Sequence, residues 1–200
     1  LLDRAAELFA EAGQFVRAAE IRHDQNRFAD SAALYEKAGR FDNAGQILAT
    51  QGEWARAAEC FVRAGRMSLA AEMFEKGGHH AQAGERYAEA GFQRHAAQAF
   101  VRAQAWAQAA AALEAVVTEE FARASSGGDA RRQKELRTLV LQAGKLYEQA
   151  GQLERAQAVL ERGGCFAAAA ELAARADRHA QAAELFLRAQ DPLRAAEALR

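Results

Sequence analysis

The sequence predicts an all-α protein, an α-solenoid of antiparallel helical hairpins, and three observations lead to this prediction. Residues that end helices recur every thirteen positions along most of the 200-residue chain. Apolar residues recur within each period at helical spacing, and no stretch alternates with the period of two that marks a strand. About a quarter of the residues are Ala and only one is Pro, a composition that favours helix throughout.

The recurring position is Gly in eight of its twelve occurrences and Asn, Gln or Asp in the others. Most of these residues tolerate the positive φ that closes the last turn of a helix. We therefore expect thirteen or fourteen helices, with turns at Gly13, Asn26, Gly39, Gly52, Gly65, Gly78, Gly91, Gln104, Gly151, Gly164, Asp177 and Gln190.

Each period reads as one short amphipathic helix. With the turn residue as position 1, the unit that begins at Gly52 has Trp54 at position 3, the pair Ala57 and Ala58 at positions 6 and 7, and Phe61 at position 10. Positions 3, 6, 10 and 13 share one helical face. A helix of about ten residues is only about 15 Å long and is not stable alone. Short connections make consecutive helices antiparallel, so the 26-residue hairpins must stack on one another.

The period is interrupted once. The unit that begins at Gln104 should be followed by a new unit near Val117. The next unit in phase begins instead at Thr138, so the chain contains 21 extra residues here. We expect two long helices, over residues 105–124 and 130–150, joined by a turn at 125–129 with Asp129 as N-cap. This predicts a single repeat domain over residues 1–200, cut from a longer array, with an extended hairpin over 105–150. Uncapped ends make self-association possible.

Charged residues gather at the tip of the expected hairpin, and folding it about Gly127 brings Glu120 level with Lys134. Two interpretations stay open. The pairs are solvated and worth less than about 1 kcal/mol each, or the tip docks a partner, because solenoid insertions often decorate a binding face. The candidate partner-binding residues are Glu119, Glu120, Arg131, Arg132, Lys134 and Arg137.

The composition and charge of the chain argue against nucleic-acid binding and against membrane insertion. The net charge is −1, from 26 bases and 27 acids, which argues against a nucleic-acid partner. No apolar run reaches the length of a membrane span, so we expect no membrane insertion. Stacking would place Cys60 and Cys165 about 30 Å apart, too far for a disulfide, which suggests a reducing, cytoplasmic setting. The Ala and Arg bias is associated with a bacterial source.

The usual catalytic patterns are missing from the sequence. The pairs Gly77-Gly78 and Gly163-Gly164 fall at helix ends and precede no Lys-Ser or Lys-Thr, so they indicate turns and no phosphate loop. The histidines His79, His80 and His95 belong to no HExxH or CxxC pattern. Carboxylates recur at position 8, the solvent side. We therefore expect no enzyme activity, no catalytic residues, no cofactor and no metal.

A recurring pattern of Ala, three residues, an aromatic, two residues and Ala carries a family resemblance. It occurs at Ala57-Phe61-Ala64, Ala83-Tyr87-Ala90, Ala96-Phe100-Ala103, Ala143-Tyr147-Ala150 and Ala182-Phe186-Ala189. It resembles the tetratricopeptide repeat (TPR), and the resemblance implies a right-handed superhelix that binds proteins. TPR units have about 34 residues, longer than the 26 of two periods here. The chain is also similar to the solenoids of vesicle-fusion adaptors and of coat and intraflagellar transport subunits.

Two functions remain. The first is an interaction scaffold or adaptor that binds a peptide or protein on the solenoid surface. The alternative is a regulatory or sensor arm of a larger signalling protein, such as a nucleotide hydrolase, whose catalytic part lies outside this segment.

Overall fold

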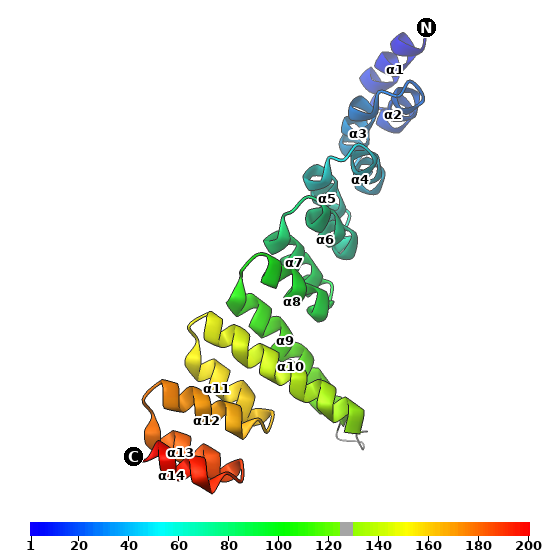
Figure 1. Ribbon diagram of the computed structural model, residues 1–200. Coiled ribbons are helices and arrows are strands. Elements are labelled where there is room, and N and C mark those ends of the chain that lie inside the picture. The colour runs from blue at the N-terminus through cyan, green and yellow to red at the C-terminus, as the bar shows by residue number, and fades with distance from the viewer. Residues whose placement is uncertain (125–129) are drawn as a thin grey trace. The chain divides into compact units, whose positions relative to one another are not determined.

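The computed structural model describes residues 1–124 and 130–200, and every regular element in these ranges is an α-helix (Figure 1). The helices are α1 (Leu2–Glu11), α2 (Phe15–Asp24), α3 (Phe28–Lys37), α4 (Phe41–Thr50), α5 (Trp54–Arg63), α6 (Met67–Lys76), α7 (His80–Glu89), α8 (Gln93–Arg102), α9 (Trp106–Ala124), α10 (Ala130–Gln149), α11 (Leu153–Arg162), α12 (Phe166–Arg175), α13 (His179–Arg188) and α14 (Pro192–Ala198). The all-α solenoid prediction is confirmed.

All twelve predicted turn residues have positive φ, including Asn26 at 58° and Gln104 at 57°. The hydrogen bonds at these turns repeat. After α1, the amide of Gln14 donates to the carbonyl of Phe9 at 2.8 Å, and the amide of Gly13 donates to Ala10 at 3.0 Å. This pair of bonds closes a helix with a left-handed residue, and it explains why the chain turns every thirteen residues.

The core is built mainly from the Ala positions and the residue at position 10. Ala57, Ala58 and Ala96 are fully buried, and Phe61 is nearly so. Small side chains at positions 6 and 7 let neighbouring helices approach closely. Position 10 is Arg22 in α2, which is also buried and pairs with Asp3 of α1.

The chain forms two compact units, Leu1–Phe92 and Gln93–Arg200. Within each unit every helix packs against the next one in sequence, from α1 to α7 in the first and from α8 to α14 in the second. This sequential packing is the arrangement of a solenoid. A single domain over residues 1–200 and the handedness of a superhelix stay predictions.

The interruption of the period consists of α9 and α10, which have 19 and 20 residues where most helices have 10. They pack against each other, and α9 also packs against α8. The expected turn at 125–129 and its cap Asp129 lie outside the described residues. Among the described helices, none combines the length and apolar character needed to cross a membrane.

Candidate functional site

Ion pairs link each helix to the second helix after it in much of the C-terminal unit. The acceptor is a Glu at position 11 and the donor an Arg at position 12 two helices later. Glu148 of α10 pairs with Arg175 of α12 at 2.6 Å, and Glu161 of α11 pairs with Arg188 of α13 at 3.3 Å. Arg188 also lies 4.1 Å from the ring centroid of Phe166, which is position 3 of the helix between. Arg188 therefore lies over the middle helix of its bridge, α12.

The same bridge cannot form between α8 and α10. Val101 occupies position 11 of α8, and Gln149 occupies position 12 of α10, so neither side chain carries a charge. Position 3 of the middle helix is Trp106, and Gln149 occupies the position at which α11, α12 and α13 have the bridging arginine. A groove of about 670 Å³ lies here, between α8 and α10 and over α9.

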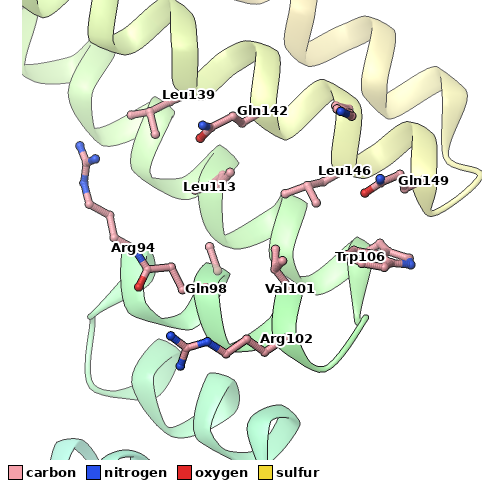
Figure 2. A pocket seen from close by; sticks show the side chains of 12 residues that line it. Arg94, Gln98, Val101, Arg102, Trp106, Leu113, Leu139, Gln142, Leu146 and Gln149 are labelled. Carbon is pink, nitrogen blue, oxygen red and sulfur yellow. The ribbon is translucent and has the colours of Figure 1, made fainter. Parts of the chain in front are cut away.

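Figure 2 shows the groove from close by. Its apolar lining comes from all three helices, with Val101 on α8, Leu113 on α9 and Leu146 on α10. Trp106 and Gln149 lie at one end of the groove, and Arg94 lies toward the other. Val101 is 39% exposed, a large fraction for an apolar residue. The groove therefore presents apolar surface to solvent.

The charged residues that line the groove are all basic. They are Arg94 and Arg102 of α8 and Lys145 of α10, and no Asp or Glu lines it. Within the described part of the chain, Arg94 and Lys145 form no ion pair with a carboxylate. A local excess of three bases in a chain of net charge −1 is a distinct feature of this surface.

The N-terminal unit contains a groove at the equivalent positions of α5, α6 and α7, with a volume of about 400 Å³. It is lined by Glu59, Val62, Arg63, Phe74, Gln82, Glu85 and Arg86. In the α8–α10 groove the corresponding residues are Gln98, Val101, Arg102, Leu113, Gln142, Lys145 and Leu146. The first groove has two acids and two bases, and its Arg86 pairs with Glu85 at 3.3 Å. At these positions the second groove has no acid, and leucines replace Phe74 and Arg86.

The long helix α10 also extends one wall of the groove. Thr138 and Leu139 occupy positions 1 and 2 of their unit, where other units turn, but here both lie inside α10. Leu139 lines the groove, whereas its counterpart His79 is the N-cap of α7 and is absent from the lining of the first groove. The interruption of the repeat thus adds apolar wall that a regular unit lacks.

A partly buried hydrogen-bond network joins α9, α10 and α11. The Tyr147 hydroxyl, on a side chain that is 1% exposed, donates to Glu114 at 2.5 Å, and Arg162 also pairs with Glu114. Burial raises the pKa of Tyr147 to about 12, and the Glu114 carboxylate adds to this rise. Burial tends to raise the pKa of Glu114, but the bonds from Tyr147 and Arg162 outweigh it and lower that pKa. The network links α9 and α10, two of the three groove helices, to α11.

Two of the predicted hairpin-tip residues pair with neighbours on the same helix. Glu119 bonds to Arg123 at 2.5 Å, and Arg131 bonds to Glu135 at 3.2 Å. These are pairs within one helix.

Glu120 pairs with Arg132 across the two helices at 3.0 Å, whereas Lys134 was the residue expected level with it. The expected register assumed a turn centred on Gly127, which lies outside the described residues. Lys134 is exposed on α10. Arg137 faces Cys165 at the start of α12, where burial raises the pKa of the thiol and the arginine charge opposes the rise. The structure does not gather the six residues into one cluster.

Comparison with known proteins gives no match, either to a family model or to a curated protein. The groove residues were not singled out in the sequence, although a position-by-position comparison of the units carries the signal: positions 8 and 9 of α10 are Lys145 and Leu146, where α7 has Glu85 and Arg86. Among the described residues, no three His, Cys, Asp or Glu side chains are placed to hold a metal ion.

Proposed function

We propose that this protein is an interaction scaffold that binds a segment of a partner protein in the groove between α8, α9 and α10. The observation that carries the proposal is the exposed apolar lining at the α8–α10 step, where Val and Gln replace the Glu and Arg of the bridge pattern seen at α9–α11, α10–α12 and α11–α13. Buried apolar surface is the main source of binding free energy in protein interfaces.

We also propose that the chain is a TPR-like solenoid and that it acts in the bacterial cytoplasm. The Ala-aromatic-Ala spacing supports a TPR-like solenoid with short hairpins. The cysteines Cys60 and Cys165 are both buried free thiols, which supports a reducing compartment such as the bacterial cytoplasm. The hairpin-tip residues remain a second, predicted contact region for the same partner.

The test is site-specific photo-cross-linking at two equivalent positions. A benzophenone amino acid replaces Gln142 in the α8–α10 groove or Gln82 in the α5–α7 groove, because both are exposed glutamines at position 5. We expect a cross-linked partner from Gln142 and none from Gln82. The partner is identified by mass spectrometry, and its binding to purified protein is measured with and without Leu146→Arg. Binding that Leu146→Arg leaves unchanged would contradict the proposed site.

A further inference from the structure

We infer that the segment bound in the α8–α10 groove is acidic and carries two or three large apolar side chains. This inference rests on the proposed function and names the chemistry of the partner. It is drawn from the charges and the apolar surface of the groove and from the contrast with its counterpart in the N-terminal unit.

The charge argument comes from the two equivalent grooves. Glu59 and Glu85 of the first groove are replaced by Gln98 and Lys145 in the second, while Arg63 is retained as Arg102. Charged side chains in the first groove balance at two acids and two bases, so it attracts neither sign of ligand. In the second groove three bases and no acid remain. A carboxylate-bearing segment would pair with Arg94 and Lys145, which have no acidic partner among the described residues.

The apolar argument concerns what lies between the charges. Leu139 and Leu146 of α10 face Val101 of α8 across the groove, with Leu113 of α9 between them (Figure 2). From Leu139 to Gln149 the wall has eleven residues, and the ten steps between them span about 15 Å of helix. That length accommodates about three turns of a helical ligand or four to five residues of an extended one. Large apolar side chains would bury this lining, and Trp106 offers a flat surface at one end.

Oligonucleotide binding fits the groove less well. Single-stranded nucleic acid needs a continuous basic track with aromatic platforms for successive bases. Here the lining offers one aromatic side chain and three bases, separated by leucines and valine. The lining therefore favours a protein segment, and competition by an oligonucleotide is measured in the experiment below.

The experiment is selection from a displayed library of random sixteen-residue peptides on the full 200-residue chain. Selection is repeated on the variant Gln98→Glu/Lys145→Glu/Leu146→Arg. This variant gives the second groove the residues that the chain itself carries at the same positions of the first groove. Far-ultraviolet circular dichroism checks that it folds. The single variant Lys145→Glu changes only an exposed side chain, so it keeps the test valid if the triple variant does not fold.

We expect the enriched peptides to combine Asp or Glu with large apolar residues. Their binding should weaken about tenfold or more in either groove variant and should also weaken as salt is raised. Charge reversal at Lys37, an exposed position-12 lysine of the N-terminal unit, is the control and should leave binding unchanged.

Neutral or basic peptides that still depend on the groove would overturn the inference and leave the proposed function standing. Peptides that are insensitive to both groove variants, or a failure of any peptide to enrich, would count against the inference and the proposed function together. Displacement of acidic peptides by single-stranded oligo(U), or a Gln142 cross-link between two copies of the chain, would also overturn the inference.

Discussion

Replacing Gly163 with Ala tests how closely α10 and α11 pack, and the expected result runs against the repeat pattern. Gly163 occupies position 13, where most other units have Ala, so the pattern alone predicts that Ala is favourable. In the structure, a Cβ added at Gly163 would lie 2.4 Å from Cγ1 and 2.6 Å from Cγ2 of Val140, which is fully buried. Such distances are too short for carbon atoms, so Val140 or the backbone must move.

The magnitude follows from two opposing effects. The φ of Gly163 is −81°, which Ala adopts without strain. Replacing Gly at such a position stabilises a protein by about 0.4–1 kcal/mol, because the unfolded chain loses freedom. Overpacking of a tight core costs about 1–3 kcal/mol. We expect the clash to win, with a net loss of about 1–2 kcal/mol in the free energy of unfolding.

Urea unfolding followed by circular dichroism measures the effect. The matched control is Gly77→Ala, also at position 13, where the added Cβ would lie 3.1 Å from the Cβ of Trp54 and from Cδ2 of His79. A smaller loss is expected there. Val140→Ala should rescue Gly163→Ala, so the two changes should couple by about 1 kcal/mol or more. Unchanged or increased stability of Gly163→Ala, or simple additivity with Val140→Ala, would refute the packing argument.

Three further predictions concern the repeat, its buried tyrosine and the hairpin. Ala96→Leu should cost about 1–3 kcal/mol by overpacking a fully buried position, and Glu59→Ala less than about 0.5 kcal/mol; equal urea midpoints would contradict the assigned phase. The pKa of Tyr147 is raised to about 12. The contribution of Tyr147 to stability should therefore be complete below about pH 10, the ordinary pKa of tyrosine, and be lost as the pH rises from there through about 12. Tyr147→Phe should remove the last step of an ultraviolet tyrosine titration. Arg132→Glu breaks a partly exposed pair with Glu120 and should change stability by less than about 1 kcal/mol, while slower, salt-sensitive association with a captured partner, measured by surface plasmon resonance, would identify the tip as a contact.

The turns and the buried face of each helix were predictable because both depend on local chemistry. Positive φ is a property of single residues such as Gly52, and the spacing of Ala57 and Phe61 is that of one helical face. Long-range pairing was not predictable in the same way. Arg22 occupies a core position because Asp3 of another helix accepts its bond, and no periodicity indicates that partner. The Val140 contact that makes Gly163 necessary is of the same kind.

The groove was predictable from the sequence only in part. Its residues keep the phase of the repeat, so comparing equivalent positions of the units shows that Lys145 stands where α7 has Glu85. The position within the repeat does not show which helices flank a groove, because α8 and α10 come to lie on either side of it only when each packs against α9. The interruption keeps positions 3 to 13 of the α10 unit in register and removes its opening turn, which places Leu139 in the wall. An insertion that only reoriented two solenoid halves would not require a basic, apolar lining at this step. The coincidence of the longer wall, the missing Glu–Arg bridge and the unbalanced charge therefore favours a bound segment over a purely structural joint.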